Sequence, residues 1–186
     1  MGANAPIFYA WGVKMNRRAR HIAYAALIAA MYAALTYLQN LLIPGSASWA
    51  IQFRASEALC VLSLFTPAAV TGLTVGCFLF NLTAASVMPI DLLVGSLATF
   101  LACGGMYLTR RISAKGVPVI GLCMPAIFNG ILVGWELSVY IGGGFLLNAV
   151  YVAIGELAVL WTLGWALYGA MHRGKLHVRL FGDTEG

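Results

Sequence analysis

Between His21 and Met171 the chain is an almost unbroken series of apolar runs, and this feature decides its fold class. Of its 186 residues, 61% are hydrophobic and 9% are charged, whereas about 25% are charged in a typical soluble domain. A soluble protein of this size has too little interior to bury so much apolar surface. The composition therefore excludes a soluble globular domain and a disordered chain. It predicts an all-α protein that crosses a membrane several times.

Six predicted helices account for the apolar runs. One bilayer crossing takes about 20 apolar residues, so this region has room for at most about six or seven spans. The run at 56–65 is short, because an α-helix of about ten residues rises only ~15 Å. We expect the helices at about residues 22–43, 56–65, 67–85, 89–109, 117–137 and 145–171.

Basic residues indicate the orientation in the membrane. All but one of the Lys and Arg residues lie in three clusters: before the first helix, between the fourth and fifth helices, and after the sixth. The positive-inside rule assigns such clusters to the cytoplasm, and a six-helix bundle with both termini cytoplasmic satisfies it. Merging the second and third helices would move the middle cluster outside, so we count the short run separately.

The predicted organisation is that of a multi-pass cell-membrane protein. We expect a cytoplasmic N-terminal extension (1–20), a six-helix membrane domain (21–172) and a cytoplasmic tail (173–186). Met1 and Met15 are alternative natural starts.

Acidic residues are scarce, and four of the six lie in or at the ends of predicted helices. They are Glu57, Asp91, Glu136 and Glu156. Ionisable side chains inside a membrane are costly and usually functional. In the six-helix topology the first three lie at outer helix ends, and Glu156 lies roughly 16 Å into the last helix. We therefore expect a binding site in the outer half, with Glu136 as the weakest candidate.

Amide, aromatic and guanidinium groups are predicted in the same half. They are Asn81, Asn129 and Asn148 in helices, and Trp49, Gln52 and Arg54 ahead of the second helix. Together with the acids they predict an outward-opening cavity for a small, planar, polar ligand, cationic ones included. Simpler roles stay open: Arg54 can pair with Glu57 across one turn, Asn129 can bridge helices, and Asn148 can satisfy its helix start.

Small residues at four-residue spacing predict close helix packing. Gly72 and Gly76, and Gly130 and Gly134, are expected to pack helices within the chain. The first helix carries more small residues than one neighbour needs, so we expect part of it to dock on a partner membrane protein. The docking candidates are Ala25, Ala26, Ala29, Ala30 and Ala33.

Several chemistries receive no support from the sequence. The four cysteines lie in apolar runs without a CxxC pair, which favours buried, reduced thiols. The three histidines lack metal-ligand spacing, and there is no phosphate-binding loop and no hydrolase motif. We therefore expect no metal, no cofactor and no enzymatic activity, with any ATP hydrolysis in separate subunits.

Five ordered motifs resemble those of the QueT family. They are QFRASEAL at 52–59, TPAA at 66–69, DLLVGSLAT at 91–99, PAIFN at 125–129 and YVAIGEL at 151–157. The likeness covers about four-fifths of the chain. Members of this family are substrate-binding S components of energy-coupling factor (ECF) transporters, thought to import queuosine precursors.

The resemblance implies a six-helix S component that works with a membrane coupling subunit and two ATPase subunits. It would bind a 7-deazaguanine (preQ1, preQ0, queuine or queuosine) outside and topple in the bilayer to release it inside. The implied leading ligand groups are the carboxylates of Glu57, Asp91 and Glu156. Secondary groups are Asn81, Asn129, Asn148, Arg54, Gln52 and Trp49.

Three alternatives stay open. The first is an S component for another small nutrient, such as a vitamin. The second is a standalone ion-coupled transporter in which Glu156 relays protons. The third is a small membrane enzyme.

Overall fold

The computed structural model describes residues 16–44, 53–84, 90–114 and 116–182, and its regular elements are all helical. They are α2 (Arg17–Leu42), the 3₁₀-helix η1 (Ala55–Leu64), α3 (Pro67–Ala84), α4 (Asp91–Leu108), α5 (Val119–Tyr140), α6 (Phe145–Val159), the π-helical turn η2 (Leu160–Gly164), α7 (Trp165–His172), η3 (Arg173–Lys175) and α8 (Leu176–Phe181). The all-α prediction is confirmed.

Four helical stretches are long and apolar enough to cross a bilayer. They are Arg17–Leu42, Asp91–Leu108, Val119–Tyr140 and Phe145–His172, whereas η1 and α3 are shorter apolar helices. Each of the six predicted runs is helical, with ends shifted by a few residues. The chain is therefore a helical membrane protein, and the number of its crossings follows from length and hydropathy only for these four stretches.

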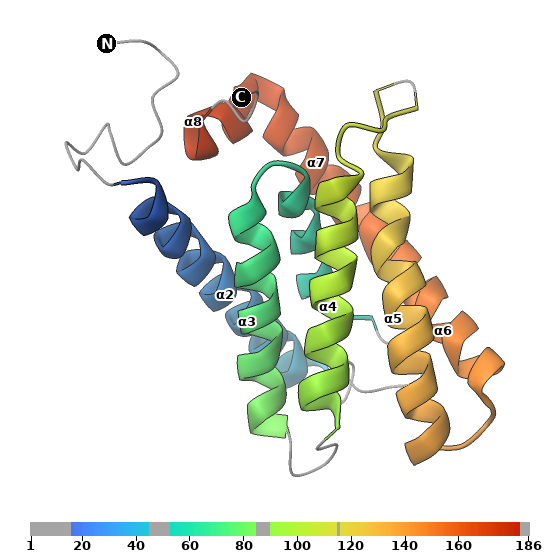
Figure 1. The fold of residues 1–186 in the computed structure, drawn as a ribbon. Helices are drawn as coiled ribbons and strands as arrows, with labels where there is room; N and C mark the ends of the chain where they lie inside the picture. The colour runs from blue at the N-terminus through green and yellow to red at the C-terminus, as the bar shows by residue number, and fades with distance from the viewer. Residues whose placement is uncertain (1–15, 45–52, 85–89, 115, 183–186) are drawn as a thin grey trace, which may run out of the picture.

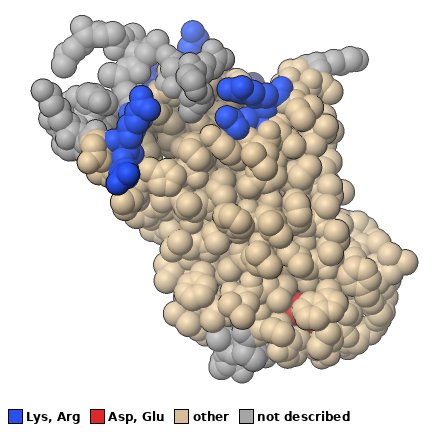
Figure 2. Space-filling view, in the orientation of Figure 1, with Lys and Arg blue, Asp and Glu red and all other residues tan. Residues whose placement is uncertain are grey.

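The long helices alternate in direction, which places sequence-distant segments at the same end (Figure 1). The start of α2, the α4–α5 connection and α7–α8 lie at one end, which we call the basic end because Lys and Arg side chains gather there (Figure 2). The connection from α5 to α6 lies at the opposite end. The described residues of the three basic clusters thus share one end, as the predicted charge pattern requires.

The short helix η1 lies inside the bundle (Figure 1). It is a 3₁₀-helix and not the α-helix that we expected, and nine of its ten residues are buried. A 3₁₀-helix rises about 2 Å per residue, so η1 reaches roughly 20 Å. Side chains three residues apart line up in this geometry, which brings Arg54, Glu57 and Cys60 onto one face.

Two features of the C-terminal part differ from the prediction. The expected continuous sixth helix contains the π-turn Leu160–Gly164, where Gly164 packs against Val61 of η1 and a Cβ would approach its Cγ2 to 3.1 Å. The expected tail contains α8, which packs on the start of α2 through the Tyr24 and Phe181 rings, 5.2 Å apart. Both features depend on contacts with distant segments, which local hydropathy does not encode.

The predicted glycine pairs pack helices within the chain. A Cβ on Gly72 or Gly76 would lie 2.6 Å from the Ala25 oxygen or 2.8 Å from the Ala29 oxygen of α2. On α5, a Cβ on Gly134 would lie 2.6 Å from the Ala149 Cα of α6. Backbone cannot retreat from such contacts without moving a helix, so these glycines set the α2–α3 and α5–α6 distances.

Candidate functional site

Arg54 is the first component of a buried polar cluster. Gln39 of α2 holds the segment before η1, because its amide donates to the Phe53 oxygen and its Oε1 accepts from the Ala55 N–H at 2.7 Å. This anchor places Arg54 in the bundle interior, where the residue is 6% exposed. Its Nη1 donates to the Tyr32 hydroxyl at 3.3 Å.

Glu57 lies one 3₁₀ turn further along η1. Its Oε1 is 3.9 Å from Arg54 Nη1 and accepts a hydrogen bond from the Tyr32 hydroxyl at 2.5 Å. Its Oε2 accepts from the Cys60 thiol at 3.1 Å. Arg54 and Glu57 thus form the ion pair across one turn that the sequence allowed. Both Glu57 oxygens have protein partners.

Asp91 and Asn81 meet where α3 and α4 approach each other. The Asn81 amide donates to the Asp91 backbone oxygen at 2.9 Å, and Asn81 Oδ1 is buried without a hydrogen-bond partner among the described residues. Gly95 makes room for both side chains, since a Cβ there would lie 2.5 Å from Asp91 Oδ1 and 2.7 Å from Asn81 Nδ2. Gly95, part of the GSLAT segment, is therefore a site residue that we had not identified.

Glu136 of α5 faces Asp91. It is 1% exposed, and neither carboxylate oxygen accepts a hydrogen bond from any donor that the structure describes. The Asp91 and Glu136 carboxyl groups interact electrostatically, and two such groups can share a hydrogen bond only when one carries a proton. Glu136, the weakest candidate in the sequence, is thus as deeply buried as any other acid of the cluster.

Glu156 of α6 supplies the fourth carboxyl group. It is 3% exposed, and its Oε1 accepts a 2.6 Å hydrogen bond from the Asn129 amide of α5. Its Oε2 has no partner within the described part of the chain. The π-turn η2 begins four residues later, and π-turns inside α-helices often mark functional sites.

These groups form one electrostatic unit. Arg54 interacts with Glu57, Asp91, Glu136 and Glu156, and Glu57 also interacts with Glu156. Four carboxyl groups therefore interact electrostatically with one guanidinium, and we call this set the carboxylate cluster. Buried charges are expensive unless they are paired, so the cluster is suited to a ligand that brings hydrogen-bond donors or positive charge.

Other predicted residues lie elsewhere or outside the description. The Asn148 amide donates to the Gly142 oxygen at 2.8 Å and so holds the turn before α6. Trp49 and Gln52 fall outside the described residues. Tyr32 is a cluster member that sequence reasoning missed, since a tyrosine in an apolar helix carries no distinctive signal.

The proposed docking alanines divide between two faces of α2. Ala29 is buried against α3, Ala25 and Ala33 are half-buried, and Ala26 and Ala30 are exposed. Small residues on the exposed face would permit close approach of a second helix.

The four cysteines are free thiols, and all but Cys123 are buried. The Cys60 and Cys103 sulfurs approach to 3.4 Å beside Glu57. Cys60 therefore contacts the carboxylate cluster directly, and Cys103 packs against Cys60.

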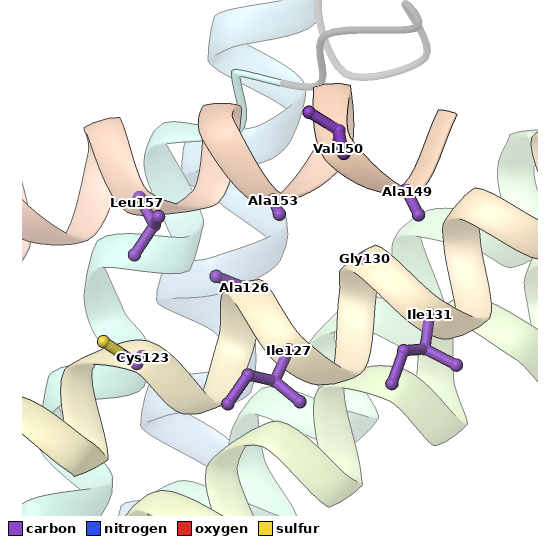
Figure 3. A pocket seen from close by; sticks show the side chains of 9 residues that line it. All are labelled: Cys123, Ala126, Ile127, Gly130, Ile131, Ala149, Val150, Ala153 and Leu157. Atoms are coloured by element: carbon purple, nitrogen blue, oxygen red, sulfur yellow. The ribbon is translucent and has the colours of Figure 1, made fainter. Parts of the chain in front are cut away.

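An apolar groove of about 390 Å³ runs between α5 and α6 (Figure 3). Its lining consists of Cys123, Ala126, Ile127, Gly130, Ile131, Ala149, Val150, Ala153 and Leu157. It contains none of the carboxylate or amide groups of the cluster, and it lacks the polar groups that orient a ligand such as a purine. This groove is therefore separate from the candidate site.

Comparison with known proteins gives one match. No curated protein and no solved structure matches the chain. The profile of the family described as QueT transporter matches residues 22–173, which contain every described member of the carboxylate cluster. Because this match covers more than half of the chain, and because the helices are membrane-like as a transporter requires, the chain belongs to the QueT transporter family.

Proposed function

We propose that this protein is the S component of an ECF importer and binds a queuosine precursor of the 7-deazaguanine class in the carboxylate cluster. The family match supports transport of a small molecule. The observation that carries the proposal is the grouping of three buried carboxyl groups and the half-buried Asp91 with one arginine, with both oxygens of Glu136 and one of Glu156 lacking donors among described residues.

The hydrogen-bonding edge of a 7-deazaguanine complements such groups. Its ring N–H and exocyclic amine are adjacent donors, which a single carboxylate can accept as a bidentate pair. Glu156 is suited to this role because Asn129 already fixes its orientation through Oε1. Asp91 and Glu57 complete the set of ligand carboxylates, and the Asn81, Asn129 and Asn148 amides add hydrogen-bonding capacity. Arg54, Gln52 and Trp49 are the remaining proposed contacts.

The charge of the cluster favours precursors that carry an amine. With every carboxyl group ionised, four negative charges face one positive charge, and a protonated aminomethyl group on the ligand would offset part of the excess. We add Glu136 to the site for this role, because neither of its carboxylate oxygens accepts a hydrogen bond from a described donor. PreQ1 and queuine carry such an amine, whereas preQ0 carries a neutral nitrile.

The proposed transport cycle follows the orientation of the helices. The basic end faces the cytoplasm, so both termini are cytoplasmic and the carboxylate cluster lies in the outer half. The exposed face of α2, including Ala26 and Ala30, docks on the coupling subunit. Two ATPase subunits drive the toppling that releases ligand inside, and the chain itself hydrolyses no ATP.

Thermal unfolding of the detergent-purified protein, with and without candidate ligands, tests the identity of the substrate. Ligand that binds only the folded state stabilises it by RT ln(1 + [L]/Kd), about 2.7 kcal/mol at a hundred-fold excess over Kd. We expect Tm to rise by at least roughly 5 °C with preQ1 and by less with preQ0, with no change for guanine.

The same panel includes a vitamin control. A shift with the vitamin and none with any deazaguanine would retain the membrane architecture and refute the substrate. Uptake in vesicles that lack the ATPase subunits, driven by a pH gradient, would contradict the ECF assignment and favour an ion-coupled transporter.

Gly95→Ala is expected to weaken preQ1 binding about ten-fold while lowering Tm by only a few degrees. The new Cβ displaces the Asp91 carboxylate and the Asn81 amide, and one charge-assisted hydrogen bond accounts for about a ten-fold change in Kd. Gly104→Ala is the matched control on the same helix, because nothing lies within 4 Å of its Cβ position. Equal affinity in the two variants would show that Asp91 and Asn81 do not contact the ligand.

A further inference from the structure

A polar cavity lies at the basic end, away from the carboxylate cluster. Its volume is about 370 Å³, and its lining combines Arg110, Arg111, Ser113, His172 and His177 with the rings of Phe65 and Tyr168. Three segments form it: the end of η1, the α4–α5 connection and α7–α8. We call it the basic pocket. The α5–α6 groove is lined by apolar side chains, whereas this cavity presents several hydrogen-bond donors.

The walls of the basic pocket are fixed by ring contacts and hydrogen bonds. The Tyr168 and His172 ring centroids are 4.5 Å apart, and those of His172 and His177 are 5.0 Å apart. The ring centroid of Phe65 lies 5.1 Å from that of His177. The Tyr168 hydroxyl donates to the Gly116 oxygen at 3.3 Å, which ties the α4–α5 connection to α7.

Only some of the hydrogen-bond donors that line the basic pocket have an acceptor among the described residues. Arg110 donates to the Tyr107 oxygen at 2.7 Å, and its guanidinium lies 3.9 Å above the Tyr107 ring. Its other N–H groups and the whole Arg111 guanidinium have no acceptor within the described ranges. His177 Nδ1 is 2.9 Å from the Met171 oxygen; a carbonyl can only accept, so Nδ1 carries the hydrogen and donates it to this carbonyl.

No acidic side chain that the structure describes lies at the basic end, since the four described acids form the carboxylate cluster. The positive-inside rule explains why basic residues are on this side. It does not require two arginines and two histidines to line one cavity. An anion from outside the described chain is the natural partner of such a group.

The depth of the pocket indicates the source of that anion. Arg110 and Arg111 follow the candidate span that ends at Leu108, Pro118 directly precedes the span that starts at Val119, and His172 ends the last span. The ends of three spans therefore meet at the pocket. Span ends coincide with the headgroup layer of a bilayer, where lipid phosphates lie.

We propose that the basic pocket binds the phosphate of an anionic membrane lipid. The two arginines hydrogen-bond the phosphate oxygens, and arginine suits this role because its planar fork matches an oxyanion. The aromatic group forms the wall that the remainder of the headgroup contacts. Free inorganic phosphate shares this chemistry, and the experiment separates the two sources.

Native mass spectrometry of the full chain in detergent measures the binding of single lipids. Detergent removes the bilayer surface, so general attraction of basic residues to a charged membrane does not contribute. We expect phosphatidylglycerol to bind at least about ten-fold more tightly than phosphatidylcholine, and Arg110→Gln/Arg111→Gln to lose about ten-fold in affinity. The control Arg18→Gln/Arg179→Gln removes the same charge at the same end outside the pocket and is expected to bind within about two-fold of wild type.

The single variant Arg111→Gln tests lipid binding in a protein that is expected to keep its fold, because Arg111 is exposed and has no described partner. We expect it to weaken phosphatidylglycerol binding about three-fold at unchanged Tm. Equal losses in the pocket and control double variants would show diffuse attraction and overturn the proposal. Equal binding of the two lipids would overturn it as well.

The second part of the experiment measures the effect of inorganic phosphate on Tm. If phosphate alone raises the Tm of wild type but not of Arg110→Gln/Arg111→Gln, while lipid binding is the same in both, the anion is soluble and the lipid assignment is wrong. If phosphate has no effect and lipid binding depends on the two arginines, the lipid assignment is supported.

Discussion

Glu156→Gln is expected to weaken preQ1 binding by about 30-fold to 100-fold without lowering the stability of the ligand-free protein. A hydrogen bond to a charged group contributes about 1.5–3 kcal/mol, and the substitution removes the charge while keeping an oxygen for the Asn129 amide. The unpartnered Oε2 is buried, and replacing a buried carboxylate by an amide relieves desolvation. Titration calorimetry measures the affinity, and thermal unfolding without ligand measures the stability.

The control for this experiment is Thr162→Val, six residues further along. Its hydroxyl donates only to the backbone oxygens of its own helix, such as Ala158 O at 2.5 Å. Binding should therefore be unchanged. Wild-type affinity in Glu156→Gln would remove Glu156 from the site, and a large fall in Tm would show that its carboxylate serves the fold instead.

Arg54→Met is expected to destabilise the protein by about 3–5 kcal/mol, the range for breaking one side of a buried ion pair. The variant leaves Glu57 and three further carboxyl groups without the guanidinium that interacts electrostatically with each of them. Methionine keeps the length and the apolar stem of the side chain, so the loss reflects charge and not a cavity. A change of this size lowers Tm by roughly 10 °C in a chain of this length.

A double variant separates electrostatic from packing effects. If the loss arises from uncompensated charge, adding Glu57→Gln to Arg54→Met should recover about half of it. Arg111→Met, at an exposed position, should change the stability by less than about 0.5 kcal/mol. A double variant as unstable as Arg54→Met would assign the loss to packing, and an unaffected Arg54→Met would show that the carboxyl groups do not depend on the guanidinium.

The candidate site was only partly predictable. Glu57, Asp91 and Glu156 stood out because charges are rare in apolar runs, and the structure brings them together around Arg54. Glu136 is the weakest candidate from the sequence, because a carboxylate at the C-terminal end of a helix is disfavoured by the helix dipole and is typical of an interfacial position. Its burial depends on how α5 packs against α4 and α6, which spacing along one helix does not reveal.

The sequence by itself determined the class of this protein, the positions of its helices and the separation of basic from acidic residues. These properties depend on local hydropathy and charge, and the alternating direction of consecutive helices then brings the basic clusters to one end. The tertiary structure decided that η1 is a buried 3₁₀-helix, that a π-turn follows Glu156, that α8 packs on α2, and that Tyr32, Gly95 and Glu136 join the site. Each of these depends on contacts between residues far apart in the chain, whose energies no local pattern contains.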